Sequence, residues 1–147
     1  LQKRGRVTNA ELADAVGLSA SPCLLRVKRL QKAGIITGYN AVVDLRKLGE
    51  AIHVFLEVTL TQHRSENFSI FESGLRRMPE VVEAHLISGG FDYLVRIVVR
   101  NLTHFQEVVE GMLDGGLGVA KYVSYIVVKS PLDNRVYPLK LLLDEAE

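Results

Sequence analysis

A strand–helix–strand pattern occurs twice between residues 52 and 128, and this repeat limits the possible folds more than any other feature. Residues 52–60 are apolar at every even position, which is the pattern of a half-buried strand. A helical pattern follows over 68–78, then strand patterns over 81–87 and 92–99, a second helical pattern over 102–112 and a last strand over 119–128. This order predicts a ferredoxin-like βαββαβ domain, with four antiparallel strands and both helices on one face.

The other face of the predicted sheet has no helix to cover it. Phe55, Leu94, Val98 and either Tyr122 or Tyr125 would lie on that face. Together they are too apolar to face water, so the face needs a partner. The simplest partner is a second copy of the chain related by a two-fold axis, and the sequence therefore predicts a homodimer.

Residues 8–34 predict two short helices around a glycine turn. Thr8 and Glu11 have the spacing of a capping box, which satisfies the first N–H groups of a helix. Gly17 suits the left-handed conformation that ends this helix. The second helix is capped by Ser19 or Ser21 and runs to Gly34. This is the layout of a DNA-reading helix-turn-helix.

The second of these helices is predicted to have an apolar face that includes Cys23 and an opposite face that is basic. Four cations lie among the seven residues from Arg26 to Lys32, with no acid between them, whereas a merely solvated face mixes both signs. Such a face fits the major groove, with Ser21, Leu25, Arg26 and Arg29 nearest the bases and Lys28 and Lys32 on phosphates. The full set of candidate DNA-binding residues is Ser19, Ser21, Pro22, Leu25, Arg26, Lys28, Arg29 and Lys32.

Charge is unevenly distributed along the chain. Residues 1–45 carry seven Lys/Arg against three Asp/Glu, and residues 46–147 carry eleven against fourteen, so a net charge of +4 is followed by −3. A basic amino-terminal part is attracted to a polyanion and an acidic remainder is not. The expected partner of the first part is therefore double-stranded DNA.

Length and composition predict a folded, cytoplasmic protein that has no membrane partner. The chain has 147 residues, 48% of them apolar, one cysteine, and no apolar run near the roughly 18 residues of a membrane span. The opening residues have no methionine and resemble the end of an earlier helix, so we expect that residues precede Leu1. The expected domains are a helix-turn-helix domain over 1–38, a linker strand over 39–50 and the ferredoxin-like domain over 51–147.

The chain resembles the Lrp/AsnC family of transcription regulators. The resemblance rests on NAELADAVGLSASPCLLRVKRLQKAGIITGY near the amino terminus, on HLISGGFDYLVRIVV in the second half, and on Gly118-Val119 with Tyr122 and Ser124. It implies a winged-helix-like helix-turn-helix joined to a ferredoxin-like domain, an α+β architecture. It also implies dimers that often assemble into octamers, and an amino-acid effector bound between subunits.

The segment around Gly89-Gly90 is the candidate effector site. A free amino acid is a zwitterion, so Asp92 could meet its ammonium group and the glycine N–H groups its carboxylate. The alternative is that the glycines only make a tight hairpin and Asp92 only caps a strand. The candidate effector-binding residues are Ser88, Gly89, Gly90, Phe91, Asp92, Tyr93, Tyr122 and Ser124.

Catalysis and metal binding have little support in the sequence. The four histidines lie on separate predicted elements without metal-ligand spacing, and there is no phosphate loop or nucleophile motif. We therefore expect no catalytic residue, no metal and no cofactor beyond the amino-acid effector. The competing class is an enzyme similar to sirohaem decarboxylases, which share this architecture, but such an enzyme has no use for a basic recognition helix. An RNA-binding ferredoxin-like domain needs a pattern of exposed aromatics that Phe55 and Tyr93 do not make.

Overall fold

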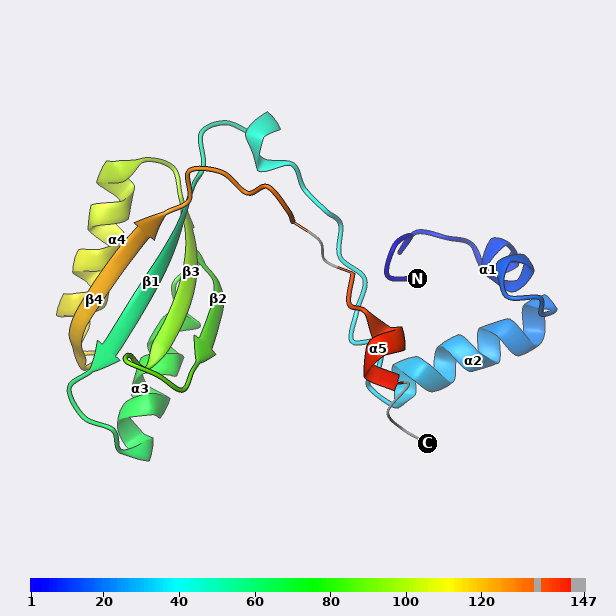
Figure 1. Ribbon diagram of the computed structural model, residues 1–147, viewed down its shortest axis with the longest axis horizontal. Coiled ribbons are helices and arrows are strands. Elements are labelled where there is room, and N and C mark those ends of the chain that lie inside the picture. The colour runs from blue at the N-terminus through cyan, green and yellow to red at the C-terminus, as the bar shows by residue number, and fades with distance from the viewer. Residues whose placement is uncertain (134–135, 144–147) are drawn as a thin grey trace. The chain divides into compact units, whose positions relative to one another are not determined.

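The computed structural model describes residues 1–133 and 136–143, apart from the side chain of Arg46. The chain divides into two compact units, one made of Leu1–Val43 with Leu132–Glu147 and the other of Asp44–Pro131. Figure 1 shows the helices α1 and α2 of the first unit and the four-stranded sheet of the second. The predicted α+β fold, a helix-turn-helix followed by a ferredoxin-like domain, is confirmed.

Helix α1 (Asn9–Ala15) begins at the predicted capping box. The Thr8 side chain accepts a hydrogen bond from the Glu11 N–H at 3.2 Å, and the Thr8 N–H donates to Glu11 Oε2 at 2.8 Å. Gly17 follows the helix with φ +66°, the left-handed conformation expected of it. The Asn9 amide also donates to the Ala20 carbonyl at 2.8 Å, which fastens α1 to the next helix.

Helix α2 (Ala20–Lys32) has Ser19 as its N-cap residue, although the Ser19 side chain makes no capping hydrogen bond. Its buried contact with α1 is small. Cys23 is 2% exposed and Ala13 of α1 is 3% exposed, whereas Leu24 and Leu30 remain 42% and 38% exposed. The predicted apolar face is therefore only partly covered within this unit.

Residues 39–50 were expected to form a linker strand, but the structure has no strand there: the segment 36–44 is irregular and is followed by a 3₁₀ turn, η1 (Leu45–Lys47). A strand requires a neighbouring strand to receive its backbone hydrogen bonds. Among the described residues no other segment pairs with it. The apolar Val42 and Val43 consequently remain 77% and 53% exposed.

The carboxyl-terminal segment belongs to the first unit, although residues 51–147 were expected to form one domain. The Gln2 amide joins this segment to the start of the chain. Its Nε2 donates to the Tyr137 carbonyl at 3.3 Å, and its Oε1 accepts from the Tyr137 N–H at 2.8 Å. A short helix, α5 (Leu139–Leu143), follows.

The second unit has the topology that the sequence predicts. Its sheet has the order β2-β3-β1-β4, every pair is antiparallel, and both helices lie on one face (Figure 1). The elements in chain order are β1 (Ile52–Leu60), α3 (Ser65–Leu75), β2 (Val81–Leu86), β3 (Tyr93–Val99), α4 (Leu102–Asp114) and β4 (Val119–Ile126).

The main core lies between this sheet and its two helices. Alternate residues of β1 and β3 are buried, and Phe71 of α3 is fully buried against them, with its ring 4.7 Å from that of Tyr93. Gly74 of α3 lies against Leu117, where a side chain on the glycine would clash with the leucine. Close packing of α3 therefore depends on a glycine at this position.

The other sheet face is uncovered within this chain. Phe55, Leu94 and Val98 lie on it, half-buried by their neighbours. Tyr125 pairs with Phe55 and so shares this face, whereas Tyr122 pairs with core-facing Val58. Of the two tyrosines that the sequence offered for the uncovered face, Tyr125 is therefore the one that lies on it.

Candidate DNA-binding and effector sites

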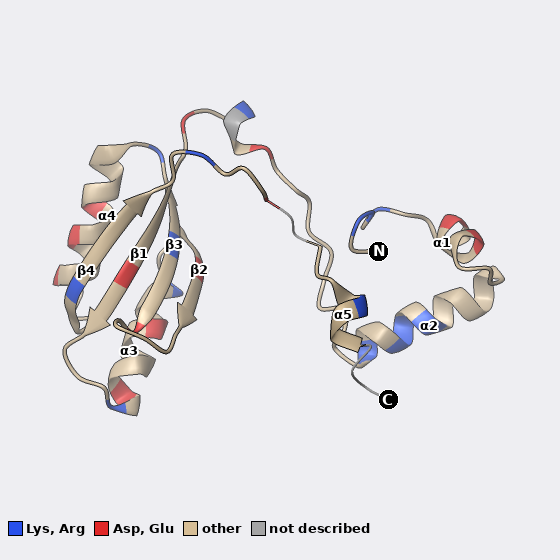
Figure 2. Cartoon of the chain, viewed as in Figure 1, with Lys and Arg blue, Asp and Glu red and all other residues tan. Residues whose placement is uncertain are grey.

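The basic face of α2 is exposed along its whole length. Figure 2 shows the Lys and Arg positions on α2 with no Asp or Glu among them. The side chains of Arg26, Lys28, Arg29 and Lys32 are all exposed, and no carboxylate of the described residues forms an ion pair with them. Unpaired cations on one helix are free to meet phosphate oxygens.

The predicted base-reading residues lie at the amino-terminal half of the same helix. Ser19, Ser21 and Pro22 are exposed around its start, and Leu25 is 57% exposed one turn later. An apolar side chain of this exposure is suited to contact a thymine methyl group. In a recognition helix the first turns meet base edges and later cations meet the DNA backbone, and the exposed residues of α2 follow the same order along the helix.

The β2–β3 connection has an open backbone at the predicted effector position. Ser88, Gly89 and Gly90 are exposed, and a β-carbon added at either glycine would meet no heavy atom within 4 Å. Gly89 has φ +155°. Phe91 is half-buried at the end of this connection. The N–H groups at Gly89 and Gly90 can therefore be approached by a small anion.

The Asp92 carboxylate is already engaged within the chain. Its Oδ2 accepts the Leu60 N–H at 2.7 Å, and His63 Nε2 lies 3.0 Å from the same carboxylate. The Asp92 N–H also donates to the Val58 carbonyl at 2.9 Å. Asp92 thus fastens the start of β3 to the end of β1, and only 16% of its side chain is exposed.

Tyr93 lies in the core, only 2% exposed, and its hydroxyl donates to Glu72 Oε1 at 2.9 Å. Burial, followed by the hydrogen bond and charge of Glu72, raises the pKa of Tyr93 to about 12. In this chain the Tyr93 side chain joins β3 to α3 and does not reach the open turn.

Of the two candidate residues on β4, Tyr122 lies towards the end of the sheet where the turn is, and Ser124 lies opposite Leu56 in the middle of β1. Tyr122 pairs with Val58, which also pairs with Tyr93, so the three residues form one row across the sheet. Tyr122 is half-buried against the core, and Ser124, one core-facing position further along the strand, is exposed. The sequence prediction omitted His63 and Glu72, which hold Asp92 and Tyr93 from distant positions in the chain.

The part of the chain that the structure describes contains no group of three His, Cys, Asp or Glu side chains that could hold a metal ion. None of the described helices is long and apolar enough to cross a membrane.

Two protein-family models match the chain. Residues 1–37 match a winged helix-turn-helix DNA-binding family, and residues 53–137 match the Lrp/AsnC ligand binding domain. The second match covers more than half of the sequence and includes both the open turn and β4.

Individual proteins of known sequence and structure are similar over most of the chain. The transcriptional regulatory protein DoeX of Halomonas elongata is 38% identical over 88% of this chain and 82% of its own length. The leucine-responsive regulatory protein of Klebsiella pneumoniae is 38% identical over 88% of this chain and 79% of its own. Among solved structures, a Neisseria meningitidis transcriptional regulator in complex with L-methionine has a TM-score of 0.89 and 32% identity, covering 97% of this chain and 92% of that chain.

Proposed function

This chain belongs to the Lrp/AsnC family of DNA-binding transcriptional regulators, and on that premise we propose that a free amino acid modulates its assembly or its binding to an operator. The observation that carries the DNA-binding role is the acid-free, exposed basic face of α2 within the matched helix-turn-helix. Ser21, Leu25, Arg26 and Arg29 contact bases in this proposal, and Lys28 and Lys32 contact phosphates.

The dimer is part of the same proposal. The uncovered sheet face, with Phe55, Leu94, Val98 and Tyr125, packs against its counterpart in a second copy. Segment 36–44 gains a backbone partner when it pairs with the same segment of that copy. Two recognition helices are then available for the two halves of an operator. Further assembly of dimers, into octamers as the family resemblance implies, remains part of this proposal.

The effector site that we propose is built on the open turn. The backbone N–H groups of Gly89 and Gly90 bind the effector carboxylate, and Ser88 offers a hydroxyl group in the same turn. Ser124 of β4 is the second candidate hydroxyl group. Asp92 holds the turn through Leu60, and its partly exposed carboxylate has lone pairs left for an ammonium group. The similar Neisseria meningitidis regulator is in complex with L-methionine, so L-methionine is the first effector to test.

The test is a thermal-unfolding screen of the twenty amino acids, followed by operator binding with each hit. A ligand that binds only the folded state raises the unfolding temperature. Fluorescence anisotropy with a labelled promoter fragment then measures whether the hit changes DNA affinity, with D-enantiomers as controls. Operator binding that no amino acid alters would contradict the effector role and leave the DNA-binding role intact.

The alternative enzyme class receives no support from a specific observation. The similar proteins named above are regulators, and the recognition helix keeps its basic face.

A further inference from the structure

An open groove with a volume of about 450 Å³ lies on the second unit, lined by residues of α3 and α4 and of the segments that follow them. Its volume lies within the roughly 300–1,000 Å³ of small-molecule sites. The floor is apolar, with Val108 and Leu117 6% and 7% exposed and Met78 half-buried beside them. The charged side chains around it are Arg77, Glu80, His104 and Glu107.

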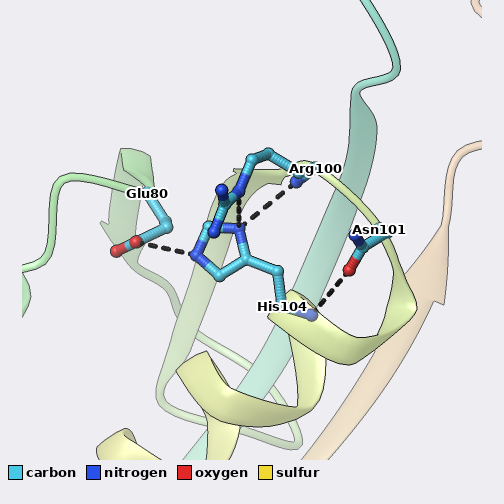
Figure 3. Close-up of polar contacts among 4 residues, drawn as sticks. All are labelled: Glu80, Arg100, Asn101 and His104. Atoms are coloured by element: carbon cyan, nitrogen blue, oxygen red, sulfur yellow. Dashed lines mark hydrogen bonds and ion pairs between the residues drawn. The ribbon is translucent and has the colours of Figure 1, made fainter.

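A chain of hydrogen bonds fixes one of these carboxylates in place. Figure 3 shows the His104 ring between Glu80 and Arg100, with Asn101 at the start of α4. The Asn101 side chain caps α4 by accepting the His104 N–H at 2.8 Å. His104 Nδ1 accepts from the Arg100 N–H at 3.3 Å, and Nε2 lies 3.1 Å from Glu80 Oε1.

These contacts determine which ring nitrogen carries the proton. Because Nδ1 accepts an N–H bond, the neutral ring carries its proton on Nε2 and donates it to Glu80. Within the described residues, Glu80 Oε2 accepts no hydrogen bond, and the Glu80 side chain is 20% exposed at the cavity. A carboxylate held in this way is preorganised to accept a donor from a bound molecule.

We infer that this groove binds an aliphatic compound with a primary ammonium group, either a free amino acid or a simple amine. Among the residues that line the groove, two carboxylates, Glu80 and Glu107, outnumber one guanidinium, Arg77, so the lining favours a cation. The Arg100 guanidinium donates to His104 Nδ1 at 3.4 Å and is not part of the lining. The apolar floor takes the aliphatic chain. Arg77 gives a free amino acid an additional partner for its carboxylate.

This site is separate from the effector turn. Glu80 precedes β2 and Arg100 follows β3, whereas the turn joins the opposite ends of these strands. The seven residues of β3 therefore separate His104 and Glu80 from the turn by roughly 20 Å. The inference does not depend on the turn being an effector site.

Gly111 allows the groove to be filled without strain. It lines the groove, and a β-carbon added there would meet no heavy atom within 4 Å. Gly111→Leu also replaces a poor helix former by a good one, so the variant should fold with an unchanged or higher unfolding temperature. Glu107→Gln removes one charge of the wall, and Glu110→Gln is the matched control on an exposed position of α4 outside the cavity.

Three probes of matched length test the inference by calorimetry on the whole protein: L-norleucine, n-pentylamine, which lacks its carboxylate, and hexanoate, which lacks its amine. We expect n-pentylamine to bind and hexanoate not to bind. We expect Glu107→Gln to weaken n-pentylamine binding about tenfold, the effect of one lost charge-assisted hydrogen bond, and Glu110→Gln to leave it unchanged. If L-norleucine binds more tightly than n-pentylamine, and Arg77→Gln abolishes that difference in affinity, the ligand of the groove is a free amino acid.

The Gly111→Leu variant, in which the groove is filled, tests whether the probes bind in the groove. n-Pentylamine binding that survives in Gly111→Leu, or hexanoate binding equal to that of the amine, would overturn the inference. If Gly111→Leu loses n-pentylamine binding but still binds L-norleucine, the L-norleucine is bound at the turn. The groove then remains assigned to simple amines. Operator affinity, measured in parallel, reports on the proposed regulatory function independently of these results.

Discussion

At the scale of single residues, Asp92 shows how one carboxylate can hold a candidate binding turn in place. It accepts the Leu60 N–H at 2.7 Å and pairs with His63 while remaining 16% exposed. Removing an acceptor leaves a partly buried N–H without a partner. The structural role that the sequence offered as an alternative is therefore present, whether or not an effector also binds there.

We predict that Asp92→Ala lowers the free energy of unfolding by about 1–3 kcal/mol, the cost of an unsatisfied partly buried donor. Urea unfolding followed by circular dichroism measures this change. His63→Ala is the control, because its side chain is 57% exposed and its loss leaves the Leu60 bond intact. Equal stability of Asp92→Ala and the parent would contradict a structural role, and effector titration of the same variant reports separately on binding.

Arg29 carries the second residue-scale prediction. Arg29→Ala should weaken operator binding by about 1–3 kcal/mol through loss of one groove contact. Anisotropy at fixed salt measures the affinity, and sedimentation confirms that assembly is unchanged. Arg76→Ala removes the same charge from an exposed position of the second unit and should leave DNA affinity unaltered. Unchanged affinity of Arg29→Ala would mean that this face of α2 does not enter the groove.

Residue contacts were predictable from the sequence only where they are local. The Thr8–Glu11 capping box spans three residues, and its spacing alone indicates the bond. The Asp92–Leu60 contact spans 32 residues, and the Tyr93–Glu72 contact spans 21. Such pairs depend on strand register and on how α3 packs, neither of which periodicity determines. The core position of Tyr93 was missed for that reason.

At the scale of elements, the bond between β3 and α3 should make stability depend on alkaline pH. The pKa of Tyr93 is raised from 10.0 to about 12 by burial and by Glu72. The folded chain thus keeps a proton that the unfolded chain releases above pH 10, so stability falls as pH rises from 10 towards 12. Below pH 10, Tyr93 is protonated in both the folded and the unfolded chain, and its full contribution to the free energy of unfolding is present.

We predict that Tyr93→Phe is less stable than the parent near neutral pH and loses part of this alkaline decline. Urea unfolding at several pH values above 9 measures both effects. Tyr137→Phe is the matched control, because Tyr137 is 72% exposed and the β3–α3 bond remains. A decline in Tyr93→Phe as steep as in the parent would assign the pH dependence to other groups.

The strands of the second unit were predictable because alternation reports which face is buried. β1 and β3 follow the predicted periodicity almost to the residue. Segment 36–44 has β-branched residues but forms no strand, because pairing requires a partner that its own sequence cannot supply. The β-strand preference of a segment therefore predicts a strand only where another segment of the chain is available to pair with it.

At the scale of the whole molecule, the uncovered sheet face should govern assembly. We predict that Leu94→Lys converts dimers into folded monomers, because a charge would be buried in the two-fold contact. Sedimentation velocity measures the mass, and far-ultraviolet circular dichroism confirms folding. Gln106→Lys, at an exposed position of α4 on the helical side, is the control. A Leu94→Lys variant that stays dimeric would move the interface elsewhere.

The two bonds between Gln2 and Tyr137 also bear on the order in which the protein is made. The first unit draws on both ends of the chain, so the ribosome must release the entire second unit before Tyr137 can reach Gln2. The sheet and its helices can fold while synthesis continues, and the DNA-reading unit is completed last. A messenger RNA that ends before the Tyr137 codon therefore yields a complete second unit and a first unit that lacks one of its two segments.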